Sequence, residues 1–212
     1  MKRKRIAVLF LCLLLTGCSF GGEEPEQVYL ASAAGFDADP SGGVILSVEV
    51  PLTRENEADR MEVCVFAGKG TTPDEAMEDL LCGLDKNLLF GHCAVLVLGD
   101  GLNAGQRAAI FSFAEKTIRL PLFAVVISAP DASALLSRGS LTASAAGYEI
   151  PDTLRLRSGG IGEGLTCRFY EVLSDPDSLT LPRFLPSDEF HAEADRLVGV
   201  RHIGPGTGEE NE

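Results

Sequence analysis

Residues 88–101, LLFGHCAVLVLGDG, decide the fold of this chain. The run 88–98 is apolar apart from the Gly-His pair at 91–92, and it ends at the turn formers of 99–101. A continuous apolar run between turn signals is typical of a strand whose two faces are both buried. We therefore expect an internal sheet strand over residues 88–98.

A helix is expected on each side of this run. Before it, Thr72 can cap a helix, Pro73 suits the first helical position, and Glu75 completes a capping box. The apolar residues of that helix are expected to share one face: Ala76, Met77, Leu80, Leu81 and Leu84. After the run, a second helix is predicted over residues 103–116. Its inward residues are expected to be Ile110, Phe111, Phe113 and Ala114.

Further strands are predicted on both sides of these helices. Runs 28–36 and 44–52 are β-prone and are separated by turn formers, which indicates a hairpin. Run 61–67 alternates as a strand does, and run 122–128 is wholly apolar. A short third helix should begin at Pro130 and Asp131 and extend through Leu136.

The order of strands and helices from 61 to 137 predicts right-handed crossovers and a locally parallel sheet. The N-terminal β-hairpin adds antiparallel strands, so the expected fold class is α/β (α+β), a mixed β-sheet with helices packed on it. Beyond residue 138 the pattern weakens. There we expect a loop over 158–164, a strand or short helix over 166–173, and an irregular stretch over 182–186.

The N-terminus has the features of an export signal. Residues 2–5 are all basic, and the apolar run 6–15 is shorter than the roughly 20 residues that a membrane-spanning helix needs. The tetrapeptide Leu15-Thr16-Gly17-Cys18 resembles the bacterial lipobox, in which lipid is attached to the cysteine before cleavage in front of it. We expect Cys18 to be the lipid-bearing first residue of the mature protein. An ordinary signal peptide cut elsewhere is the alternative.

The charge of the chain excludes some partners. Without residues 1–17 it keeps 14 of its 18 basic residues and all 31 acidic residues, a formal net charge of −17. Such a surface repels phosphate backbones and anionic headgroups, which argues against nucleic-acid binding and against membrane docking by charge. The anchoring must then come from lipid.

No catalytic, cofactor-binding or metal-ligating residue is assigned. The cysteines other than Cys12 and Cys18 form no C-x-x-C pair and are expected to be mostly buried free thiols: Cys64, Cys82, Cys93 and Cys167. His92 is expected to be a structural histidine at a strand entry, His191 to lie on a solvated face, and His202 to lie near a frayed end. The glycines of 159–164 are a weak nucleotide-binding pattern, since no clear strand precedes them.

Several short elements occur together in one order. They are the lipobox Cys18, Ala34-Gly35-Phe36-Asp37 at a strand end, Ala67-Gly68-Lys69-Gly70-Thr71 before a helix, Leu89-Phe90-Gly91-His92 before the apolar run 94–99, and Ile118-Arg119-Leu120 before the next strand. In this the chain resembles the N-terminal domain of the Ger(x)C spore germination lipoproteins, the C subunits of germinant receptors. The resemblance extends over about 18–137 and thinly to about 200.

The resemblance implies a non-enzymatic lipoprotein of endospore-forming, Gram-positive bacteria, held by acyl chains such as palmitate on the outer face of the inner spore membrane. Its partners would be two integral-membrane receptor subunits of the A and B types. The expected organisation is a signal peptide over 1–17, a tether over 18–27, the germination-type domain over 28–203 and a disordered acidic tail over 204–212. Typical members continue through further domains, whereas this sequence ends after the first.

Three function classes follow, and each makes a structural prediction. A scaffold or coupling subunit of a germinant receptor, which we expect, should expose an apolar patch. A free-standing lipid-anchored solute-binding module should contain a concave pocket with a few convergent polar groups. An extracytoplasmic hydrolase should have a cleft with paired ionisable groups.

Overall fold

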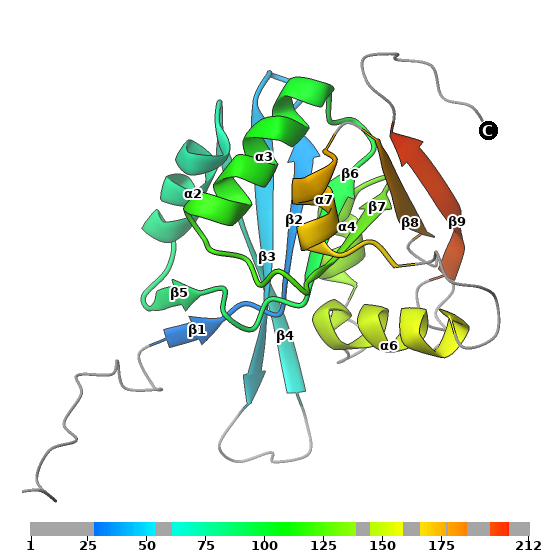
Figure 1. Ribbon diagram of the computed structural model, residues 1–212. Coiled ribbons are helices and arrows are strands. Elements are labelled where there is room, and N and C mark those ends of the chain that lie inside the picture. Colours follow the sequence, from blue (N-terminus) through cyan, green and yellow to red (C-terminus); the bar gives the residue numbers. More distant parts are fainter. Residues whose placement is uncertain are drawn as a thin grey trace, which may run out of the picture.

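The computed structural model describes residues 28–53, 61–138, 145–158, 166–176, 178–185 and 196–203. Figure 1 shows a main sheet with helices on both sides and the short strands β1 and β5 beside it. The strands are β1 (Val28–Leu30), β2 (Ala33–Ala38), β3 (Val44–Thr53), β4 (Met61–Gly70), β5 (Asn87–Leu89), β6 (Val95–Gly99), β7 (Val125–Ala129), β8 (Leu179–Leu185) and β9 (Arg196–Ile203). The helices are α2 (Pro73–Cys82), α3 (Ala104–Lys116), α4 (Ala132–Ser137), α6 (Ala146–Ser158) and α7 (Phe169–Ser174).

The main sheet is mixed and has seven strands in the order β4-β3-β2-β6-β7-β8-β9. Strands β2, β6, β7 and β8 pair in parallel, while β3 and β9 pair antiparallel with their neighbours. The predicted hairpin is confirmed as β2–β3, in which Ala38 pairs with Val44. The predicted fold class is therefore confirmed.

Two predicted strands are each divided in two. The run 88–98 forms β5 and β6, and the run 28–36 forms β1 and β2. Strands β1 and β5 pair in parallel as a separate small sheet, and the chain then crosses from it to the main sheet at both places. The crossing segments bind each other, because the Ala31 N–H donates to Leu89 O and the Ala94 N–H donates to Ser32 O. The turn at 91–92 gives the second segment the bend that it needs.

Each face of the main sheet has its own hydrophobic core. One core contains side chains of α2, α3 and α7, and the other contains side chains of α4 and α6. In Figure 1, α2, α3 and α7 lie across the near face of the sheet. All five residues of β6 are buried, as expected for a strand covered on both faces.

Glycine on β4 allows α2 to approach the sheet closely. A Cβ at Gly68 would overlap the backbone of Ala76 and Leu80 on that helix. Gly35 on β2 has the same function on the other face, where an added Cβ would lie 2.9 Å from the Cβ of Ala132 on α4. Real Cβ atoms essentially never come that close to another atom, so a side chain at either position would push a helix away.

The predicted helix starts are confirmed with small changes. Thr72 Oγ1 accepts a hydrogen bond from the Glu75 N–H (3.2 Å), but the Glu75 carboxylate accepts from Thr71 rather than from Thr72. Asn103 and Gln106 form a full capping box at α3, and Asp131 caps α4. Leu81 was placed on the buried face of its helix, and that was wrong, because its side chain is exposed.

Other predicted strand positions need correction. The run 61–67 forms the edge strand β4 beside β3, so it does not adjoin the parallel strands that follow it in sequence. Strand β7 begins at Val125 and not at 122. Leu122 and Phe123 form a turn before it, where their side chains are exposed.

The C-terminal part is more regular than the sequence pattern indicated. Helix α6 was not predicted, and 182–186 was expected to be irregular although Leu179–Leu185 forms β8. Pro182 lies in β8, where it is paired with Val200 of β9, while the one registered pair of β8 with β7 is Ser128–Arg183. The expected tether, signal peptide and acidic tail, and the stretches 159–165 and 186–195, lie outside the described residues.

Candidate functional site

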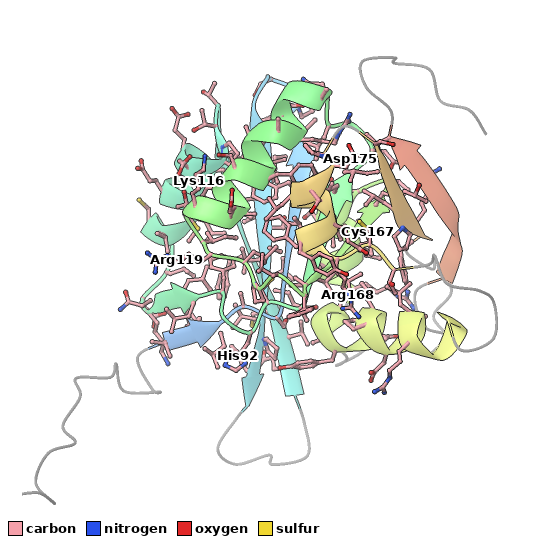
Figure 2. All side chains as sticks on the ribbon, in the orientation of Figure 1. His92, Lys116, Arg119, Cys167, Arg168 and Asp175 are labelled. Atoms are coloured by element: carbon pink, nitrogen blue, oxygen red, sulfur yellow. The ribbon has the colours of Figure 1, made fainter. Side chains whose placement is uncertain are left out.

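The Phe-Gly-His turn is where the chain crosses between the two sheets. Phe90 is buried and its carbonyl accepts from the Cys93 N–H (2.9 Å), which closes the turn. His92 was expected to be a structural histidine of the core, but its side chain is exposed. Figure 2 shows it at the end of the sheet where the chain enters β2 and β6.

A fully buried carboxylate lies at this same end, under the first turn of α6. Glu49 on β3 accepts three hydrogen bonds, from Ser32 Oγ (2.6 Å), the Ala146 N–H (2.7 Å) and the Gly147 N–H (2.9 Å). Burial raises the pKa of Glu49 above its ordinary value, and these three donors offset part of that rise. The carboxylate thus connects β3, the segment before β2 and α6.

Asp37 performs a similar function at the opposite end of the sheet. It is the next-to-last residue of β2, and its two oxygens accept from the Ala132 N–H (2.8 Å) and the Ser133 N–H (2.9 Å) at the start of α4. Burial raises the pKa of Asp37, while the two backbone donors lower it. Gly99 on β6 leaves room for this side chain, since a Cβ there would overlap Asp37 Oδ1.

The other acids at the carboxyl ends of the parallel strands also bind protein groups. Asp100 follows β6 and forms an ion pair with Arg183 of β8 (2.5 Å). Asp131 follows β7 and accepts from the Ala134 N–H (2.7 Å), while Asp39 accepts from the Ser41 N–H (3.0 Å). These acids hold the elements around them, which gives each a structural function.

Large apolar side chains are exposed at the other end, where β2, β6 and β7 begin. Six of the seven exposed large hydrophobic residues in the described part of the chain lie there, and they are named here the amino-end surface: Leu30, Leu89, Leu122, Phe123, Tyr148 and Tyr170. Phe123, at 75% exposure, stacks edge-on against Tyr170, with 6.0 Å between the ring centroids. Arg168 holds the turn by donating from Nη1 to Phe123 O (2.8 Å), and Figure 2 places it at this end.

All four described cysteines are free thiols. Cys93 and Cys167 are buried as predicted, and burial raises their pKa values to about 12 and about 11. Cys64 is half-buried. Cys82 is exposed, contrary to the expectation, because it is the last residue of α2 and lies off the face that packs on β4.

The described residues contain no group of three histidine, cysteine or acidic side chains that could hold a metal ion. Within the same residues, no helix has the length and apolar character needed to cross a membrane. The predicted lipid-bearing Cys18 and His191 lie outside the described part of the chain, so the lipid assignment stays a prediction. His202 lies in β9, where its backbone pairs with Thr180.

Residues 21–184 match the model of the spore germination protein N-terminal domain, which is 164 of the 212 residues. The chain belongs to this family. The resemblance to Ger(x)C proteins found in the sequence is thereby confirmed. No curated protein and no solved structure matches the chain.

The sequence elements shared with this spore germination family have structural functions here. Gly35 and Gly68 are the positions where α4 and α2 approach the sheet, and Asp37 binds the first turn of α4. The function of Glu49 was missed, because a single glutamate in an apolar strand does not indicate which helix it binds. One signal was available: Ala146, Ile150 and Leu154 recur at every fourth position, as in a buried helix stripe.

Proposed function

We propose that this protein is a non-enzymatic, lipid-anchored subunit of a membrane germinant receptor, and that it acts as a scaffold or coupling component in nutrient-triggered spore germination. The observation that carries the proposal is the position of the family match. The matched domain begins at residue 21, three residues after the lipobox cysteine, Cys18. A germination-type domain is thus preceded directly by an anchoring signal.

The anchor in this proposal is lipid on Cys18, placed on the outer face of the inner spore membrane. Each buried methylene contributes about 0.8 kcal/mol, and two or more acyl chains hold a protein stably where one chain does not. A mature chain with a formal charge of −17 gains little from attraction to anionic headgroups. Covalent lipid is therefore the anchor that fits this composition.

A role without catalysis is supported by the hydrogen bonds and the ion pair that the buried Glu49 and the half-buried Asp37 and Asp100 form. Glu49 accepts from three protein donors and Asp37 from two, and Asp100 is paired with Arg183. An acid that must take up or release a proton in a reaction needs access to substrate. These three instead hold helices and strands in place, and a rigid domain of this kind suits a subunit that positions two integral-membrane partners of the A and B types.

The test is recovery of partners from spore membranes. The chain is tagged after Glu212, membranes are solubilised gently, and the proteins that stay bound are identified by mass spectrometry. The proposal predicts stoichiometric recovery of two multispanning proteins, and none from untagged spores. Recovery of the chain alone, under conditions in which a known membrane complex survives, would contradict it and favour the free-standing solute-binding module.

A further inference from the structure

The amino-end surface is unusual because its large side chains come from five separate places in the sequence. Leu30 and Leu89 end the small sheet, and Leu122 and Phe123 precede β7. Tyr148 and Tyr170 lie in the first turns of α6 and α7. Backbone hydrogen bonds join these places in two pairs: the Tyr170 N–H donates to Leu122 O (3.1 Å), and the Ala31 N–H donates to Leu89 O (2.9 Å). Exposed apolar residues gathered in this way mark an interaction surface.

The chain enters the domain at this same end. Val28 begins β1, whose last residue is Leu30, and Figure 1 shows β1 beside the lower end of the main sheet. Ten residues, from Cys18 to Gln27, separate the predicted lipid from β1, and a segment of that length spans at most about 35 Å. A lipid on Cys18 therefore keeps the membrane close to the amino-end surface.

The charges near the amino-end surface are mixed: Lys86, Arg119 and Arg168 accompany Asp85, Glu149 and Glu171. The opposite end of the sheet is mixed as well, because Lys69 lies near Asp39 and Arg183 pairs with Asp100. Charge therefore does not set the orientation, which follows from the exposed apolar side chains and from the place where the chain enters the domain.

We propose that the amino-end surface lies on the headgroup region of the membrane, with Phe123 and Leu122 inserted at the boundary of the acyl chains. This inference rests on the proposed function, because it requires the lipid on Cys18. Apolar side chains of an anchored domain can enter that boundary to a depth of about 5–10 Å. The lipid would hold the chain on the membrane, and this surface would fix its orientation.

The experiment uses the absence of tryptophan from the sequence. Phe123→Trp introduces a single reporter in the full, lipid-modified chain, which is placed in vesicles of phosphatidylcholine and phosphatidylglycerol with or without brominated acyl chains. We expect the tryptophan emission to shift to shorter wavelength on the vesicles and to lose intensity with the brominated lipid. Leu122→Trp is the second reporter if circular dichroism shows that the first variant is misfolded.

The control is Ala108→Trp, at an exposed position of α3 near the opposite end. The first turn of α3 lies at the carboxyl end of the sheet, because Gln106 Nε2 donates to Gly43 O in the β2–β3 turn (2.6 Å). Its emission should be the same in plain and brominated vesicles. Equal emission from Phe123→Trp in the two vesicle types would overturn the inference, as would quenching that is equal at both sites.

Mass spectrometry of the Cys18 peptide separates this result from failure of the proposed function. If the peptide carries acyl chains and Phe123→Trp is not quenched, the orientation is wrong while the anchor stands. If the peptide carries no lipid, the anchor fails and the orientation fails with it. A blue shift that needs spore membrane proteins, and is missing in pure vesicles, would assign the surface to a protein partner and overturn the inference.

Discussion

The carboxyl ends of the parallel strands and their amino ends differ in what they leave exposed. At the carboxyl ends, Asp37 and Asp131 accept backbone hydrogen bonds from α4, and Asp100 pairs with Arg183. At the amino ends, Phe123 and Leu122 are exposed at 75% and 52%. One end thus has polar groups bound to protein groups, and the other has apolar groups exposed to solvent.

This difference bears on where such a protein can act. In open α/β sheets, small ligands usually bind outside the carboxyl ends of the strands. Here the acids at that end hold helices and strands together, so their removal should affect stability first. The exposed side chains of the amino-end surface, such as Leu122 and Phe123, can be altered with little loss of stability, which suits the membrane-facing surface proposed above.

The largest expected effect is on the proposed lipid anchor at Cys18, from which the proposed orientation of the amino end follows. Cys18→Ala should move the chain from the membrane fraction to the soluble fraction, because the variant lacks the thiol to which the lipid would be attached. Fractionation of spores followed by immunodetection measures this. Persistence of the variant in salt-washed membranes would mean that protein contacts alone retain the chain.

The next largest effect should come from the one buried acid at the amino end. Glu49→Ala should lower the free energy of unfolding by about 3 kcal/mol, because it leaves two backbone N–H groups at the start of α6 without an acceptor and removes the shorter of the two bonds that the Ser32 hydroxyl donates. Urea unfolding followed by circular dichroism measures the loss. Glu78→Ala, at an exposed position of α2, is the control and should change stability by less than about 0.5 kcal/mol.

Asp37→Ala tests the carboxyl end. It should lower the free energy of unfolding by less than Glu49→Ala does. It removes the acceptor for two N–H groups at the start of α4, and the loss of a helix-capping acceptor typically costs about 1 kcal/mol. The same unfolding measurement applies, with Asp39→Ala for comparison, a half-buried neighbour that accepts from the Ser41 N–H rather than from a helix. If both variants had the same stability, Asp37 would not be holding α4.

The pH dependence of stability should show whether burial or hydrogen bonding has the larger effect on the pKa of Glu49. Because burial raises its pKa in the folded protein, the folded state binds the proton more strongly than the unfolded state. The free energy of unfolding, relative to Glu49→Gln, should then fall as pH rises from the ordinary value of 4.5 toward the raised pKa. A rise over that interval would show that the three donors outweigh burial.

The smallest stability effect is expected at the amino-end surface itself. Phe123→Ser removes an exposed ring whose aromatic contact is with Tyr170, and it should change the free energy of unfolding by less than about 0.5 kcal/mol. A loss comparable to that of Asp37→Ala would mean that Phe123 supports the fold. The side chains at the two ends would then contribute similarly to stability, although those of the amino-end surface are exposed.

The sequence predicted the central part well because its signals are local. The cap at Thr72, the capping residue Asn103 and the apolar run of β6 each act within a few residues. The division of 88–98 into two strands could not be predicted from the sequence. It depends on backbone hydrogen bonds to Ala31 and Ser32, which lie more than 55 residues away.

The candidate site was harder to predict than the fold. Glu49 binds Ala146 and Gly147 across 97 and 98 residues, and nothing near it in sequence indicates that partner. Leu122 and Phe123 belong to an apolar run, which favoured a buried strand. Their exposure depends on where the turn before β7 ends, and tertiary packing rather than local pattern sets that point.

The central claim is that this chain acts in germination from a lipid-anchored position. The most direct measurement is nutrient-triggered germination of spores that lack the chain, complemented either by the wild type or by Cys18→Ala at equal protein levels. We predict that the wild type restores germination and that Cys18→Ala does not. Full restoration by Cys18→Ala, or normal germination of the deletion spores, would contradict the claim.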